Sequence, residues 1–131
     1  MPIRKPWLKS VLWKIPVISN ENPVKSLKLE AEDNDFTFTC VSMGNPHAVT
    51  FIKEDVNKFD ICKYGAKLEV NKAFPKKANI EFINVIDDKT LKMRVWERGA
   101  GETLACGTGA CAVTVSAILN GYTKRVVTVH L

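Results

Sequence analysis

The stretch Trp96-Glu-Arg-Gly-Ala-Gly-Glu-Thr-Leu-Ala-Cys106-Gly-Thr-Gly-Ala-Cys111-Ala-Val-Thr-Val-Ser-Ala-Ile-Leu119 passes from the end of a strand, through a glycine-rich loop, into an apolar helix. From Thr108 to Leu119 almost no polar face is left, which predicts a helix that is buried nearly all round. Asn120-Gly121 supplies a C-terminal stop. The pattern therefore predicts a core helix with Cys106 at its start.

The rest of the chain has the pattern of paired strands. Phe36, Phe38 and Cys40 alternate with threonines, which is the period of a strand with one buried face. A short helix is expected at 61–68, and the residues at 44–47 have the composition of a turn. The predicted strands are 24–30, 36–43, 48–52, 80–86, 90–96 and 125–131.

One central apolar helix surrounded by mostly antiparallel strands is an α+β arrangement. The 131 residues fit a single domain, 1–131, in which residues 1–16 form a linker-like lead-in. The first residues are basic but are interrupted by prolines, so they do not resemble a targeting peptide, and a cytoplasmic location is expected. No segment has the length and apolarity of a membrane span.

Charge and cysteine usage narrow the function classes. The net charge is +5, but the lysines are scattered rather than gathered in a basic stripe, which argues against nucleic-acid binding. Four cysteines and two histidines show no zinc-type spacing, so neither disulfides nor a metal is implied. Cys40, Cys62 and Cys111 are predicted to be packing residues.

The loop before the apolar helix combines two chemical properties. Gly107 and Gly109 let the backbone approach a ligand closely. The N–H groups at a helix start favour a carboxylate or phosphate, and the same field stabilises a thiolate at Cys106. A small buried hydrophobic role for Cys106 is the alternative. A phosphate loop is disfavoured because the segment lacks the Gly-Lys-Ser/Thr ending.

These residues resemble the diaminopimelate epimerase family. Glu97-Arg98-Gly99, followed by Gly101 to Ala112, is similar to that family's second active-site signature. Val41-Ser-Met-Gly-Asn-Pro-His47 resembles its substrate loop, and Ala78-Asn-Ile-Glu-Phe82 resembles a third substrate contact. The similarity runs from about Lys5-Pro6 to Leu131, with the three motifs in the family's order.

The resemblance implies a pseudo-symmetric fold of two halves, of which this chain resembles the second. It implies inversion of LL-diaminopimelate to the meso form, in the lysine and cell-wall precursor pathway, by two cysteines and no cofactor. One thiolate removes the α-proton and the other thiol protonates the opposite face. The resemblance assigns Cys106 as one acid/base thiol and His47 and Glu97 as groups that tune the thiols. The implied substrate-binding residues are Asn45, Asn79, Glu97, Arg98, Gly107 and Thr108.

The chain departs from the family pattern because the first half, with its own cysteine, and the last strands are not in this sequence. The expected partners are therefore the small-molecule substrate and either a first half-domain or a second copy of the chain. Two other functions fit the same residues. One is an isomerase or racemase of the same fold that acts on another substrate, such as an enzyme of the phenazine-biosynthesis type. The other is a non-catalytic half-domain that kept the fold.

Overall fold

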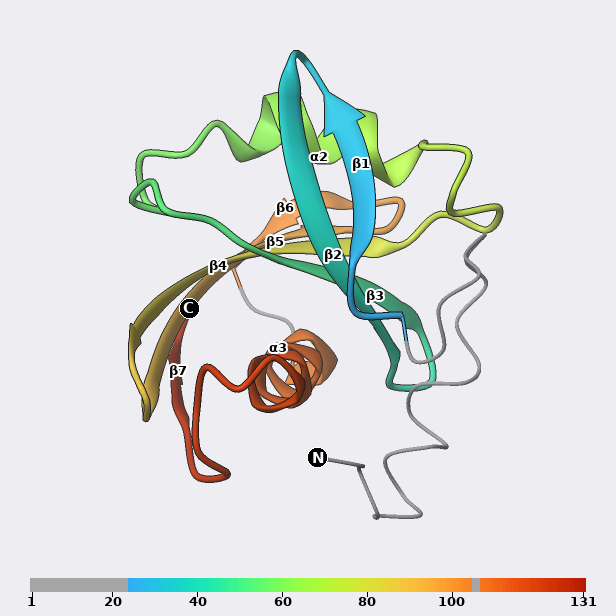
Figure 1. Cartoon of the computed structure of the whole chain (residues 1–131). Helices are drawn as coiled ribbons and strands as arrows, with labels where there is room; N and C mark the ends of the chain where they lie inside the picture. The colour runs from blue at the N-terminus through green and yellow to red at the C-terminus, as the bar shows by residue number, and fades with distance from the viewer. Residues whose placement is uncertain (1–23, 105–106) are drawn as a thin grey trace.

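The computed structural model describes residues 24–104 and 107–131, which form one seven-stranded sheet with a helix on each face (Figure 1). The predicted lead-in at residues 1–16 lies outside the described residues. The helices are α2 (Ile61–Glu69) and α3 (Gly107–Leu119). The strands are β1 (Leu27–Ala31), β2 (Asn34–Ser42), β3 (Pro46–Phe51), β4 (Asn79–Asp87), β5 (Thr90–Glu97), β6 (Gly101–Thr103) and β7 (Thr128–His130).

The sheet has the order β1-β2-β3-β4-β5-β6, and β7 also pairs with β5. Strand β6 pairs with the end of β5 at Val95–Glu97, whereas β7 pairs with its beginning at Thr90–Lys92. Among the described strands only the pairs β3–β4 and β5–β7 are parallel. The predicted α+β class with mostly antiparallel strands is confirmed, and the strand predicted at 125–131 is shortened to β7.

Consecutive residues of the central strands enter two separate cores, because successive side chains of a strand point to opposite faces. Phe82 packs into the core under α2, and its neighbour Ile83 packs into the core around α3. The core under α2 also contains Phe36, Phe38, Cys40, Ile61, Leu68 and Ile80. The core around α3 also contains Val41, Val49, Met93, Val95, Ala112 and Val113. Strands β2, β3 and β4 are thus buried on both faces.

The sheet curves around α3, which is seen nearly end-on in Figure 1, and α2 lies on the outer face. The prediction that the helix at 108–119 is buried nearly all round is wrong. Ala112, Val113 and Ala117 are fully buried, but Thr108 and Cys111 are exposed. The sheet covers one side of α3 and leaves the side that carries these two residues open in the described structure.

The predicted stop at Asn120-Gly121 is confirmed. Gly121 has a φ of +73°, and its N–H donates to the carbonyl of Ile118. The N–H of Tyr122 donates to the carbonyl of Ala117. This pair of bonds is a Schellman motif, in which a glycine adopts the left-handed conformation that other residues disfavour. The motif turns the chain away from α3 and towards β7.

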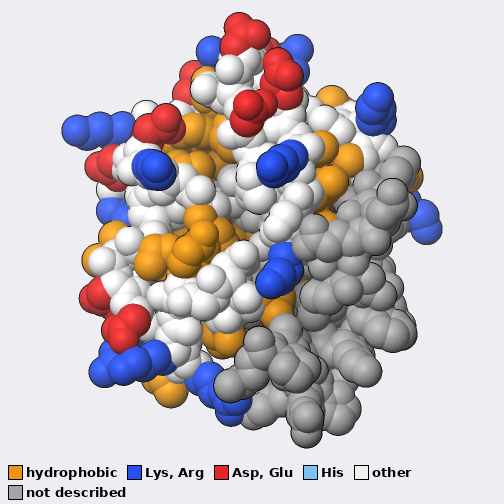
Figure 2. All heavy atoms as spheres, in the orientation of Figure 1, with side chains coloured by type: hydrophobic (Ala, Val, Ile, Leu, Met, Phe, Trp, Pro, Cys, Tyr) orange, Lys and Arg blue, Asp and Glu red, His pale blue; other side chains and the backbone are white. Residues whose placement is uncertain are grey.

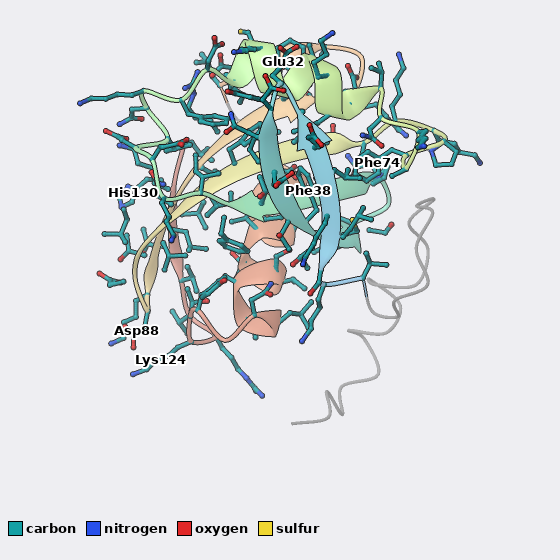
Figure 3. All side chains as sticks on the ribbon, turned by 45° about the horizontal axis from the view of Figure 1, so that its top comes forward. Glu32, Phe38, Phe74, Asp88, Lys124 and His130 are labelled. Carbon is teal, nitrogen blue, oxygen red and sulfur yellow. The ribbon has the colours of Figure 1, made fainter. Side chains whose placement is uncertain are left out.

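The segment between α3 and β7 is hydrogen-bonded to the β4–β5 hairpin. Lys124 donates a backbone hydrogen bond to the carbonyl of Asp88, and its ammonium group lies 3.3 Å from the Asp88 carboxylate. Figure 3 shows these two side chains side by side at the tip of the hairpin. The N–H of Thr128 donates to the carbonyl of Lys89. These bonds place β7 beside the beginning of β5.

The cysteines outside the glycine-rich loop differ in burial. Cys40 is buried on β2, as predicted, but Cys62 and Cys111 are exposed, so their predicted packing roles are wrong. Helix α2 buries Ile61, Gly65 and Leu68, which share one face at spacings of four and three residues. Cys62 lies one position away from that face and therefore points outward.

Charged side chains lie on the surface without forming a basic stripe on the face that Figure 2 shows. Lysines and arginines are scattered there, and acidic side chains gather at the top, where Figure 1 has the β1–β2 hairpin. Within residues 24–104 and 107–131, no helix combines the length and the apolarity needed to cross a membrane.

Candidate active site

The substrate-loop residues lie where β2 turns into β3. Gly44 adopts a φ of +89°, and the N–H of Met43 donates to the carbonyl of Asn45, which closes a tight turn. Strand β3 begins at Pro46, two residues before the predicted strand, so His47 belongs to the sheet rather than to the turn. It is fully buried there. Asn45, the residue directly before β3, is half-buried.

The parallel pairing of β3 with β4 brings the second motif beside the first. His47 is in register with Asn79, and the Asn79 side chain donates to the carbonyl of Pro46 at 3.1 Å. Two residues further along β4, Glu81 lies on the same face as Asn79, because side chains alternate along a strand. The Glu81 carboxyl oxygen Oε1 lies 2.5 Å from Nδ1 of His47.

A continuous hydrogen-bonded chain leads from Glu81 to α3. The other ring nitrogen of His47, Nε2, lies 3.0 Å from Oδ1 of Asn45. The Nδ2 atom of Asn45 donates to the hydroxyl of Thr108 at 3.4 Å. Thr108 is the second residue of α3, so four side chains connect the interior of the sheet to the helix start.

Burial favours the uncharged forms of the two buried members of this chain. Desolvation lowers the pKa of His47 to about 4; the negative charge of Glu97 opposes this shift and the positive charge of Arg98 adds to it. Desolvation, with the negative charge of Glu97, raises the pKa of Glu81 well above its ordinary value. We therefore describe the pair as a neutral carboxylic acid hydrogen-bonded to a neutral imidazole rather than as an ion pair.

The third motif forms a turn after β5. The carbonyl of Glu97 accepts from the N–H of Ala100, and Gly99 adopts a φ of +76°. The backbone N–H of Arg98 donates to Oδ1 of Asn79 at 2.7 Å, and its guanidinium donates to the carbonyl of Lys76 at 3.4 Å. Asn79 therefore joins the β3 turn to the β5 turn.

The helix start contributes Gly107 and Thr108, which are both exposed. The first turn of α3 carries no acidic residue, so the positive end of the helix dipole is not neutralised from within the helix. Such a terminus suits a carboxylate. Cys106, the predicted acid/base thiol, lies outside the described residues, and its neighbour Gly107 begins the helix.

The structure brings most of the sequence-predicted site residues together. Hydrogen bonds connect Asn45, His47 and Thr108 in one chain and Asn79 with Arg98 in a second. Glu97 is half-buried, and its charge acts on the pKa of both His47 and Glu81. Among residues 24–104 and 107–131 no group of three His, Cys, Asp or Glu side chains could hold a metal ion.

Two buried acidic residues at the site had no predicted role. Glu81 was part of a quoted motif, and Glu69 of α2 accepts hydrogen bonds from the Gly99 N–H and from the indole of Trp96. The signal for Glu81 was a single charged residue within the apolar strand 80–86. A carboxyl group at such a position needs a buried hydrogen-bond partner, which His47 provides.

Comparison with known proteins shows the family to which this chain belongs. The sequence profile of the family described as diaminopimelate epimerase matches residues 39–131. The chain belongs to the diaminopimelate epimerase family. It is 58% identical over 117 residues to the diaminopimelate epimerase of a Methanococcus maripaludis strain, which covers 89% of this chain and 42% of that relative.

Bacterial members of the diaminopimelate epimerase family are similarly close. The diaminopimelate epimerase of Acetivibrio thermocellus is 56% identical over 117 residues, covering 89% of this chain and 41% of the relative. The diaminopimelate epimerase of Desulfitobacterium hafniense is 51% identical over 127 residues, which cover 97% of this chain and 44% of that relative. The chain thus spans about two fifths of the length of the curated relatives it matches.

Proposed function

We propose that this chain is the part of a diaminopimelate epimerase that supplies Cys106 as one of two acid/base thiols. The observation that carries the proposal is the connection of Asn45, His47 and Thr108, from two separate motifs, beside the start of α3. Relatives that carry the name diaminopimelate epimerase match almost the whole chain. A first half-domain, or a second copy of the chain, would supply the other thiol.

In the proposed reaction a thiolate removes the α-proton of LL-diaminopimelate and leaves a planar carbanion. The thiol on the opposite face then donates a proton to the same carbon, which inverts it to the meso form. The negative charge that develops on the α-carboxylate needs hydrogen-bond donors that are already in place. The exposed start of α3, at Gly107 and Thr108, is suited to that task.

The remaining assignments concern recognition of the substrate and the state of the thiols. Asn45, which is half-buried, and Asn79 are assigned to the distal amino-acid end of the substrate, and Glu97 and the exposed Arg98 complete the pocket. Asn79 is buried and uses its amide to join Pro46 and Arg98, but an asparagine side chain has two donors and two acceptor sites, so capacity for a substrate contact remains. His47 and Glu97 are assigned to tuning the thiols.

The exposure of Leu104 supports the proposal that another protein surface covers this site. Leu104 lies two residues before Cys106, and its side chain is 96% exposed. A large apolar side chain next to a charged-substrate site is well placed to be buried against a partner domain. A closed site would also exclude water from the carbanion.

A chimeric enzyme tests the proposed function directly. This chain would replace the matching segment of the Methanococcus maripaludis relative, and α-proton exchange of LL-diaminopimelate would be followed in deuterated water. We expect exchange with inversion, and its loss in the Cys106→Ala variant. Proline serves as the alternative substrate. A folded chimera that leaves diaminopimelate unchanged, or that exchanges proline instead, would reject the proposed function.

A further inference from the structure

Glu81 is a fully buried ionisable side chain in the middle of the sheet. Its Oε1 atom contacts His47, and its Oε2 atom has no hydrogen-bond partner among residues 24–104 and 107–131. Burying a carboxyl group with one oxygen unbonded costs stability, and an apolar residue of similar shape would avoid that cost. The position of Glu81 therefore calls for a role other than packing.

The chain of side chains from Glu81 to Thr108 has two self-consistent directions. In the first, Glu81 donates to Nδ1 of His47, Nε2–H donates to Asn45 Oδ1, and Asn45 Nδ2 donates to Thr108. In the second, every donor and acceptor is exchanged, so that Thr108 donates to Asn45 and the carboxylate of Glu81 accepts from Nδ1–H. A neutral imidazole has one donor and one acceptor nitrogen, so the directions cannot be mixed.

The contacts correspond to the first direction. Asn45 places Oδ1 towards His47 and Nδ2 towards Thr108. Nε2 must then carry the hydrogen, because an amide oxygen only accepts. The hydroxyl of Thr108 accepts the hydrogen bond from Asn45.

We propose that Glu81 is a positioning residue of the site: the hydrogen bond from its buried carboxyl group to Nδ1 fixes the Nε2–H tautomer of His47, and with it the orientation of the Asn45 amide against Thr108. Burial supports the donor role of Glu81, since it raises the pKa of this carboxyl group and lowers that of His47. The effect on catalysis rests on the proposed function, whereas the effect on the tautomer does not.

Two substitutions separate the proposed role from mere packing. In Glu81→Gln the introduced amide N–H can donate to Nδ1 as the acid does, so the direction of the chain is kept. In Glu81→Leu the side chain keeps a similar volume but has no donor, so His47 loses the bond that selects its tautomer. The glutamine variant is therefore expected to behave as the wild type and the leucine variant is not.

Nitrogen-15 NMR of the histidine rings in the 131-residue chain measures the tautomer directly. The sequence contains only His47 and His130, and the exposed His130 on β7, labelled in Figure 3, is assigned with the His130→Gln variant. Near neutral pH we expect a neutral Nε2–H ring for His47 in the wild type and in Glu81→Gln. In Glu81→Leu we expect a mixture of tautomers or the Nδ1–H form.

Each possible result decides the inference. An imidazolium or an Nδ1–H ring at His47 in the wild type would overturn it, as would an unchanged Nε2–H ring in a folded Glu81→Leu variant. If the leucine variant does not fold, as judged from its amide spectrum, the wild type and Glu81→Gln decide alone, and loss of the Nε2–H form in Glu81→Gln would overturn the proposal.

The chimeric enzyme supplies the catalytic readout. Glu81→Leu should lower kcat by about ten- to a hundredfold, because it misplaces groups at the site, and should change KM less. Glu81→Gln should retain most of the wild-type kcat. A chimera without epimerase activity but with the expected tautomers would reject the proposed function and leave the role of Glu81 intact. An active chimera in which His47 has the wrong tautomer would reject the role of Glu81 and leave the proposed function intact.

Discussion

Glu69 accepts a 2.6 Å hydrogen bond from the backbone N–H of Gly99, so the end of α2 holds the turn that follows β5. Its second carboxyl oxygen accepts from the indole N–H of Trp96 at 3.2 Å. Trp96 and Gly99 lie on either side of Glu97 and Arg98. The buried carboxyl group of Glu69 therefore fixes the backbone of the two residues that the family resemblance assigns to the substrate pocket.

Glu69→Ala should destabilise the fold by about 1–3 kcal/mol, because it leaves two partly buried donors without an acceptor. Urea unfolding monitored by circular dichroism would measure the change. Glu32→Ala is the matched control, since the Glu32 side chain makes, among the described residues, an exposed 3.8 Å ion pair with Lys67 and should change stability by less than about 0.5 kcal/mol. Equal effects of the two substitutions would contradict the anchoring role of Glu69.

A second prediction concerns the contact between α2 and β5. A Cβ atom added at Gly65 would lie 2.6 Å from Cγ of Trp96, which is closer than carbon atoms approach. Gly65→Ala should cost about 1–3 kcal/mol through overpacking, although alanine favours helices more than glycine does. In a Trp96→Val background the same substitution should be neutral or stabilising. A cost that is unchanged in the valine background would show that Trp96 is not the obstacle.

The strands and α3 were largely predictable from the sequence because their apolar residues follow simple periods. Phe36, Phe38 and Cys40 alternate with threonines, and β2 has these residues on one buried face. Helix α3 begins one residue before the predicted range and ends at Leu119, where Gly121 forms the predicted stop. Local chemistry determines these features, so they appear in the sequence.

The burial of single residues was less predictable because it depends on which elements pack together. Cys111 lies in an apolar helix but on the side that the sheet does not cover. Glu81 lies on a strand buried on both faces, where a period of two carries no information about which face meets α3. Its pairing with His47 depends on the parallel register of β3 and β4, which no local pattern specifies.

The reactivity of the cysteines gives a third prediction. If the start of α3 stabilises a thiolate at Cys106, brief treatment with iodoacetamide at pH 7 should modify Cys106 about tenfold faster than the exposed Cys62 and Cys111. Peptide mapping by mass spectrometry identifies the modified residue, and buried Cys40 should react last. A Cys62→Ser, Cys111→Ser variant removes the competing exposed thiols. Labelling of Cys106 no faster than that of Cys62 would reject a stabilised thiolate.

The pH dependence of stability gives the last prediction. The folded-state pKa of Glu81 lies well above its ordinary value of 4.5, so above pH 4.5 the folded protein retains a proton that the unfolded chain releases. Stability conferred by this group therefore falls as pH rises from 4.5 through the folded-state pKa. For His47 the pKa is lowered from 6.5 to about 4, so the unfolded chain holds the extra proton between these values and stability rises with pH across that window.

Glu81→Gln separates the contribution of Glu81 to the pH dependence from that of His47. Glutamine cannot ionise, but its amide N–H can still donate a hydrogen bond to His47. The free energy of unfolding of the variant minus that of the wild type should rise with pH above 4.5, by at most about 1.4 kcal/mol per pH unit for one proton. Urea unfolding of both proteins between pH 4.5 and pH 8.5, at constant ionic strength, measures this difference. Glu97→Gln should reduce the total loss of wild-type stability over this pH range, since the charge of Glu97 contributes to the raised pKa of Glu81. A difference that stays constant with pH would mean that Glu81 ionises alike in the folded and unfolded chains, and that the carboxyl group beside His47 is not held in its protonated form.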